Sequence, residues 1–416
     1  MDEDWDDWTT QELCDLRALY EGSPSAFARR LGVDKRTVYR WVSGATRPAE
    51  RAIIARLDAL ARELIARKAP WLVDLQGRML MRRRDALRYL AGGVLLPLPL
   101  PGVVPSVPRG VSDRQLDHIE ATTTALAGVY DNAAPQGLMA PVMAHLEDAS
   151  RLLPGVMLPK QRDRLLSLTG DLAVFIAYLA LRSDRLGQMD AYLRLAESRA
   201  GEARDHVLLA EVFSARGYLY SPTVNGGRQG DPKTAVKLLE RASELAVDAP
   251  GPVRSRAAAR LAEERAVAKD ADGSDEAMDR AAYALDDRRG RTMPEAGFLS
   301  MKGLYAHWRA SRFGGFQGVC DVFLDRPERA VPILQARLGS PLPPVLRAIN
   351  LTDLGAAQAP QDPLEAAGHL IEAHKLNLDN GHTLGYQRIL GARERIDDRA
   401  ADLAKVRELD AWLRIT

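Results

Sequence analysis

Residues 25–44 read SAFARRLGVDKRTVYRWVSG, and they carry the strongest structural signal in the 416-residue chain. Ala28 is small, as two closely crossing helices require where their backbones meet. Four residues later Gly32 can supply the positive φ of a tight turn, and Asp34 is suited to cap the following helix. The pattern predicts two short helices whose shared core consists of Phe27, Leu31, Val33, Val38 and Trp41.

A further helix is predicted on each side of this pair. Thr9 and Glu12 have the spacing of a capping box at a helix start, and Leu13 and Leu16 begin an apolar face. After Pro48, apolar residues at helical spacing predict an amphipathic helix over residues 49–67. Residues 9–68 are therefore expected to form one small helical domain.

This domain resembles the helix-turn-helix of Cro/repressor-type (XRE-family) regulators. The resemblance rests on the spacing within residues 25–44 and on the trailing GATRP at 44–48, which is similar to the family's G-x-x-x-P close. Pro24 departs from the family pattern, which often has a glutamine that contacts the DNA backbone. The residues by themselves also allow an unrelated helical hairpin with a basic face.

The resemblance implies that the second helix of the motif enters the major groove, where its outward side chains meet base edges. Other side chains would contact phosphates and fix the register without reading sequence. Arg30 is expected to lie on a solvated helix face. The expected base-contacting residues are Lys35, Arg36, Tyr39 and Arg40, with Thr37 and Ser43 at the margins, and the expected phosphate-contacting residues are Ser25, Arg29 and Arg47.

Charge is segregated along a chain whose net charge is +1. Residues 1–23 carry eight acids and one base, whereas residues 24–88 carry sixteen bases and six acids, a net of +10. A basic block of this size is typical of a phosphate-backbone binder, although a membrane surface or an acidic partner would suit it too. The acidic tail, residues 1–8, could compete with phosphates for the basic surface, or it could be a solubilising tail.

Residues 69–111 form a basic, apolar and proline-rich junction. Three arginines at 82–84 precede an apolar stretch and look like a twin-arginine export signal, but they lie far inside the chain. The stretch from 89 to 104 is shorter than the roughly 20 residues of a membrane span and contains three prolines. We expect a short helix and a stiff linker rather than a membrane contact. With two cysteines and no signal peptide, a cytoplasmic protein is predicted.

Residues 112–416 are predicted to be helical throughout, which makes the expected fold class all-α. An alanine, an apolar or small residue four positions later and a small residue seven positions later recur. The recurrences resemble degenerate tetratricopeptide repeats, although the tryptophan and glycine-tyrosine positions of the first helix are mostly absent and the spacing is irregular. A generic alanine-rich bundle is the alternative. The copies are Ala191/Leu195/Ser198, Ala235/Leu239/Ala242, Ala277/Ala281/Ala284, Ala366/Leu370/Ala373 and, departing at its last position, Ala330/Leu334/Arg337.

No catalytic, metal-binding or cofactor-binding motif is evident, so neither an enzyme nor a cofactor is expected. The order of modules resembles peptide-pheromone-responsive regulators and actinobacterial XRE regulators with a tetratricopeptide-like region. It implies a homodimeric transcriptional regulator that binds double-stranded operator DNA. The ligand implied is a peptide or protein in the repeat groove, with lining residues unknown. The alternatives are a protein-interaction scaffold for which DNA binding is a tether and, less favoured, an enzyme built on the helical domain.

Overall fold

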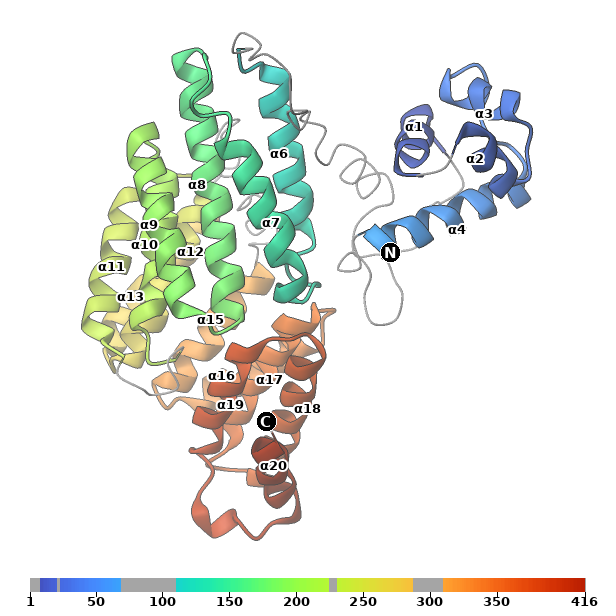
Figure 1. Ribbon diagram of the computed structural model, residues 1–416. Coiled ribbons are helices and arrows are strands. Elements are labelled where there is room, and N and C mark those ends of the chain that lie inside the picture. Colours follow the sequence, from blue (N-terminus) through green and yellow to red (C-terminus); the bar gives the residue numbers. More distant parts are fainter. Residues whose placement is uncertain (1–7, 21–22, 69–109, 224–229, 287–309, 416) are drawn as a thin grey trace. The chain divides into compact units, whose positions relative to one another are not determined.

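The computed structural model describes residues 8–20, 23–68, 110–223, 230–286 and 310–415. These residues form eighteen α-helices and no strand, so the described chain is all-α (Figure 1). The chain divides into two compact units, here called unit 1 (Met1–Arg109) and unit 2 (Gly110–Thr416). The predicted junction at residues 69–111 lies outside the described residues, except for its last two positions.

The described part of unit 1 consists of four helices around a small apolar core. The second and third helices pack against each other, the first packs against the third, and the fourth covers the second. The core residues Phe27, Leu31, Val38 and Trp41 are buried as predicted, whereas Val33 is half-buried. The helices are α1 (Thr10–Leu19), α2 (Pro24–Leu31), α3 (Lys35–Val42) and α4 (Arg51–Lys68).

Local signals predicted from the sequence set the ends of these helices. The capping box at Thr9 and Glu12 is present at the start of α1. Gly32 ends α2 with a φ of 70°, a left-handed conformation that suits glycine. The Asp34 carboxylate accepts a hydrogen bond from the Arg36 backbone N–H at 2.6 Å and so caps α3. The two short helices are therefore joined by only three residues.

Trp8 packs into unit 1 just before α1 begins. Its indole is 2% exposed, and its Nε1–H donates to Asp58 Oδ1 on α4 at 2.9 Å. Trp8 is therefore anchored to α4 both by burial and by a hydrogen bond. The rest of the acidic tail, residues 1–7, lies outside the described residues.

The described part of unit 2 is a succession of helices. Its described helices are α6 (Asp113–Gly128), α7 (Pro135–Ser150), α8 (Pro159–Arg182), α9 (Leu186–Ala203), α10 (His206–Tyr220), α11 (Pro232–Leu245), α12 (Gly251–Val267), α13 (Ala271–Asp286), α15 (Ala310–Phe323), α16 (Pro327–Leu338), α17 (Pro344–Gln358), α18 (Pro363–Asp379), α19 (Thr383–Arg393) and α20 (Ala404–Ile415), with a 3-10 turn at Asp398–Ala400.

The helices of unit 2 pack as consecutive pairs: α8 with α9, α10 with α11, α12 with α13, α15 with α16, and α17 with α18. The first helices of successive pairs also contact one another, from α8 through α10, α12, α15 and α17 to α19. In addition, α19 contacts α8, and Gln136 Nε2 at the start of α7 donates to the Gly381 carbonyl at 3.0 Å. The layer of first helices therefore closes upon itself.

The recurrent small-residue pattern falls on the second helix of each pair. In α11, α13, α16 and α18 the three residues of each copy are buried. The copy assigned in α9 is wrong, because Ala191 and Ser198 are exposed. The buried triplet there is Met189, Leu193 and Ala196, two residues earlier and with the same spacing.

Glycines of the first helices face this pattern. A Cβ on Gly217, Gly318 or Gly355 would lie 3.3, 2.7 or 2.9 Å from the leucine at the centre of the partner triplet. A Cβ on Gly170 of α8 would lie 3.5 Å from the carbonyl oxygen of Ala196 in α9. The helices of a pair approach so closely because one of them has no side chain at the contact.

One helix of unit 2, α8, is long and apolar enough to cross a membrane. Its most apolar 18-residue window is 94% buried inside the unit. Such all-round apolarity is what a helix surrounded by other helices requires. Here α8 is contacted by α6, α7, α9, α10 and α19.

Candidate nucleic-acid interface and the polar interior of unit 2

One face of α3 consists of exposed, mostly cationic side chains. Lys35, Arg36, Tyr39 and Arg40 are all exposed, and Tyr39 is 55% exposed. On the opposite face Trp41 and Val38 are buried against the rest of unit 1. The helix repeat puts the exposed residues, at positions i, i+1, i+4 and i+5, on one side.

The cations of this face have no anionic partner within the described part of the chain. Neither Arg36 nor Arg40 forms an ion pair there, and Lys35 Nζ lies 5.6 Å from the centre of the Tyr39 ring. By contrast, Arg30 pairs with Glu63 at 2.8 Å, and Arg56 Nη1 donates to the Leu31 carbonyl at 2.9 Å. Arg30 and Arg56 therefore have partners within unit 1, whereas the cations of α3 have no anionic partner among the described residues.

The other predicted DNA-contacting residues are exposed or partly exposed as well. Ser25 and Arg29 are exposed on α2, and Arg47 is exposed in the segment between α3 and α4. Thr37 is half-buried at the edge of the exposed face. Ser43 is the C-cap residue of α3, and its hydroxyl donates to the Arg40 carbonyl at 3.2 Å. All nine residues are thus accessible except Thr37, which is accessible in part.

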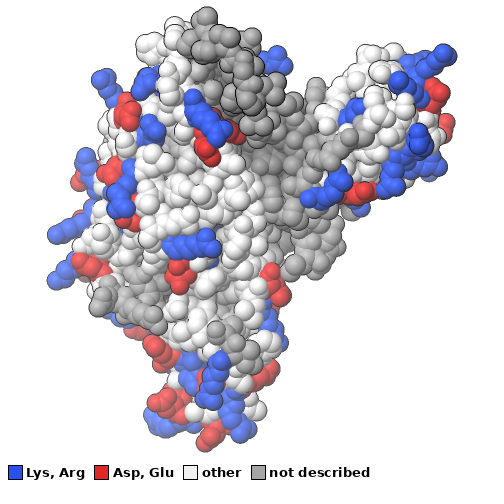
Figure 2. Space-filling view, viewed as in Figure 1, with Lys and Arg blue, Asp and Glu red and all other residues white. Residues whose placement is uncertain are grey.

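Residues 24–68 contain eleven bases and four acids. Figure 2 shows correspondingly more blue than red on unit 1, whereas blue and red are intermixed over the visible face of unit 2. A surface that is positive over one small helical unit attracts polyanions and releases their counterions on binding.

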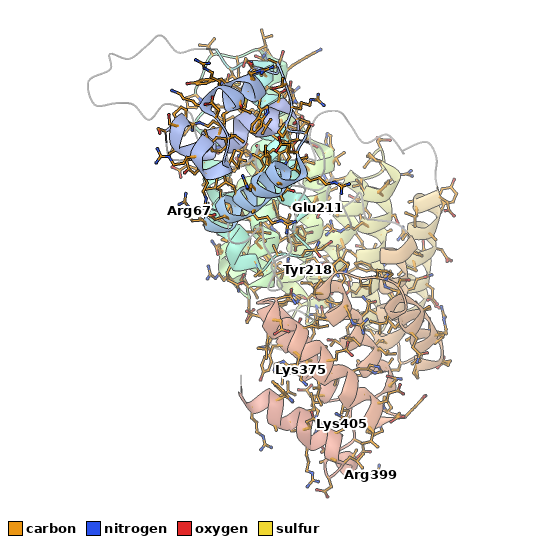
Figure 3. The ribbon with its side chains drawn as sticks, turned by 90° about the vertical axis from the view of Figure 1, so that its right-hand side faces the viewer. Arg67, Glu211, Tyr218, Lys375, Arg399 and Lys405 are labelled. Atoms are coloured by element: carbon orange, nitrogen blue, oxygen red, sulfur yellow. The ribbon has the colours of Figure 1, made fainter. Side chains whose placement is uncertain are left out.

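In unit 2 a buried polar network lies between the first helices of successive pairs. The Tyr178 hydroxyl on α8 donates to Glu211 Oε1 on α10 at 2.5 Å. Arg256 on α12 pairs with the same carboxylate and donates from Nη2 to the Tyr178 oxygen at 2.8 Å. Burial raises the pKa of Tyr178 well above its ordinary value, so its hydroxyl remains a donor at neutral pH. Figure 3 labels Glu211 and Tyr218, both from α10, in this interior.

Arg260 is the most deeply buried cation described in unit 2, with no exposed side-chain surface. It pairs with Glu263 and, at 3.0 Å, with Glu264, and its guanidinium carbon lies 3.8 Å from the centre of the Tyr218 ring. Burial tends to lower the pKa of Arg260, but Tyr218 and the two glutamates have the opposite and larger effect. The pKa is therefore raised, and Arg260 stays charged. Burial raises the pKa of Glu264.

This network was not predicted from the sequence. A signal was present, since Arg256, Arg260, Glu263 and Glu264 recur at three- and four-residue spacing within an alanine-rich helix. Such a spacing is equally typical of a solvated face, and only the neighbouring helices make it a buried one. Among the described residues, no group of three or more His, Cys, Asp or Glu side chains could hold a metal ion.

Comparison with known proteins adds no assignment to either feature. No protein-family model matches the chain, and no curated protein matches it with significance.

Proposed function

We propose that the protein is a sequence-specific DNA-binding transcriptional regulator and that unit 1 is a Cro/repressor-type helix-turn-helix domain. In this proposal α2 and α3 are the two helices of the motif, and α3 enters the major groove. The observation that carries the proposal is the exposed face of α3, where Lys35, Arg36 and Arg40 have no ion-pair partner among the described residues. A fold that pairs the neighbouring Arg30 but leaves these three unpaired is suited to an external polyanion.

Unit 2 is, in the same proposal, a tetratricopeptide-like repeat domain that senses a ligand and dimerises in the cytoplasm. The consecutive helix pairs with buried small residues support this. Stacked pairs bury a continuous core and present an extended surface to peptides or other chains. A small helix-turn-helix domain gains affinity by binding two half-sites, so a homodimer on a two-fold symmetric operator is expected.

The test is DNA binding by the full-length protein. Genome-wide mapping of bound DNA supplies the operator, and fluorescence anisotropy then compares operator with random DNA. Arg36→Ala and Arg40→Ala should each weaken operator binding by about 1–3 kcal/mol and leave binding to random DNA largely intact. Equal weakening on both DNAs would show that these residues contact only phosphate.

Arg30→Ala is the matched control, because Arg30 is an exposed arginine of unit 1 that already pairs with Glu63. It should leave both affinities unchanged within about twofold. Light scattering of the free protein and of its DNA complex tests the dimer. Absence of any DNA enrichment, together with a stoichiometric protein partner in pull-downs, would favour the scaffold function instead.

A further inference from the structure

Unit 2 contains a cavity of about 240 Å³ at the ends of several first helices. One part of its wall is apolar and includes Val267 of α12, Val322 and Phe323 of α15, and Ala356 of α17. The cavity is far larger than the roughly 30 Å³ that one water molecule occupies. It is also smaller than most sites for drug-sized ligands, so it suits a compact apolar group.

The opposite part of the wall is polar and comes mainly from α19. Arg388 Nη2 donates to Asp353 Oδ1 of α17 at 2.8 Å, and the side chain of Arg388 is 19% exposed. Its other N–H groups have no hydrogen-bond partner among the described residues, nor does the neighbouring Gln387 amide. Asp353 therefore holds one side of the guanidinium and leaves its other donors without an acceptor among the described residues.

The other charged residues of the wall do not occupy these donors. Arg395 is held by Asp325 at 2.5 Å and by the Val322 carbonyl at 3.2 Å. Glu394 is exposed and so well solvated. A guanidinium that is held on one side and has free N–H groups on the other can donate two parallel hydrogen bonds to the oxygens of a carboxylate.

We propose that this cavity binds a small amphipathic carboxylate, with the acid group on Arg388 and the apolar body against Val322 and Phe323. The proposal rests on the ligand-sensing role proposed for unit 2 and names the class of ligand. The same chemistry could come from a free carboxylic acid or from the C-terminal residue of a peptide.

Gly391 allows the cavity to be blocked without disturbing the helix packing. It lines the cavity on α19, and a Cβ built on it meets no atom within 4 Å. Gly391→Leu should therefore fill the cavity while unit 2 stays folded. Gly201→Leu is the matched control, because Gly201 lies on α9, is exposed and has the same open surroundings.

The experiment measures binding to the full-length protein by saturation-transfer NMR and calorimetry. The probes are 4-phenylbutyrate, octanoate, the primary amides of both, and a phenylalanine-terminated pentapeptide with a free or an amidated C-terminus. The acids should bind about tenfold or more tightly than their amides, since removing a paired charge weakens recognition strongly. Gly391→Leu should abolish binding, Gly201→Leu should retain it, and Arg388→Gln should remove the preference for the acid.

The free acids and the peptide separate the two sources. Binding of the free-C-terminus peptide that exceeds binding of both acids assigns the site to peptide ends, and the reverse assigns it to free acids. If neither free acid nor the free-C-terminus peptide binds, or if Gly391→Leu binds as the wild type does, the proposal is overturned. Operator affinity measured with and without the bound probe tests the regulatory role separately, because acid binding without any effect on DNA supports the site and contradicts only the sensing function.

Discussion

The arginines of α3 and those of α12 have opposite surroundings. On α3, Arg36 and Arg40 are exposed and have no ion-pair partner in the described residues. On α12, Arg256 and Arg260 are enclosed, paired with glutamates and stacked on tyrosine rings. The same residue type thus provides an accessible charge in unit 1 and an internal structural contact in unit 2.

The difference follows from desolvation. A buried guanidinium is tolerated only where carboxylates and aromatic faces replace its water, so its removal leaves those carboxylates buried and unpaired. An exposed guanidinium keeps its hydration and contributes little to folding. Stability should therefore depend on Arg260, and affinity for polyanions should depend on Arg36 and Arg40.

The largest expected effect is that of removing Arg260. Arg260→Ala should lower the free energy of unfolding of unit 2 by about 3–5 kcal/mol, because Glu264 loses a buried partner. Arg40→Ala should change stability by less than about 0.5 kcal/mol. Urea denaturation followed by circular dichroism compares the two variants, and equal stability losses would contradict the contrast.

A second effect concerns pH, because all seven histidines of the chain lie in unit 2. Burial, with help from Arg182 and Arg388, lowers the pKa of His382 from 6.5 to about 3. Below pH 6.5 His382 becomes protonated in the unfolded chain, whereas in the folded chain it stays neutral down to about pH 3. The stability associated with neutral His382 is therefore complete above pH 6.5 and is lost as the pH falls toward 3.

Lowering the pH from 7 to 5 should therefore reduce the free energy of unfolding by about 2 kcal/mol through His382. Denaturation of the His382→Gln variant at both pH values should show a correspondingly smaller change.

A smaller effect separates two glycines of unit 2. Alanine at Gly355 would place a methyl group 2.9 Å from Leu370, so Gly355→Ala should destabilise unit 2 by about 1 kcal/mol after the gain in helix propensity. Gly368 has open space around it, so Gly368→Ala should stabilise the unit by about 0.5 kcal/mol. Thermal melts check the opposite signs, and stabilisation by both changes would disprove the close helix contact.

The smallest effect is that expected of the acidic tail. Removing residues 1–7 takes away five acids that precede Trp8, which is anchored to Asp58. If the tail competes with phosphates, the truncated protein should bind random DNA a few-fold more tightly at low salt, with the difference shrinking as salt rises. Identical binding at every salt concentration would make the segment a solubilising tail.

Local signals predicted unit 1 well. The cap at Thr9, the turn at Gly32 and the cap at Asp34 each depend on residues within four positions along the chain, so the sequence contains all of their determinants. The aspartate-proline starts of α11 and α18 were predictable for the same reason, and both aspartates accept a backbone N–H. The DNA-contacting roles remain predictions.

The register of the small-residue pattern was harder to predict. In α9 the triplet at Ala191 and the triplet at Met189 fit the same spacing, and alanine is too frequent to choose between them. The choice came from packing, because Met189, Leu193 and Ala196 are buried where α9 packs against α8. A pattern of small residues indicates that two helices approach closely, but it does not identify the face of the helix at which they meet.

The sequence by itself determined the helical class, the described helices of unit 1 and the outward cations of α3, since each follows from near neighbours in the chain. The polar interior of unit 2 and the cavity beside Arg388 depended on the tertiary fold. Their partners are distant in the chain: Arg256 reaches Glu211 across 45 residues and Tyr178 across 78, and Arg388 reaches Asp353 across 35. Whether such a charge is solvated or buried is decided by the neighbouring helices, because burial is a property of the packed layers and not of any single helix.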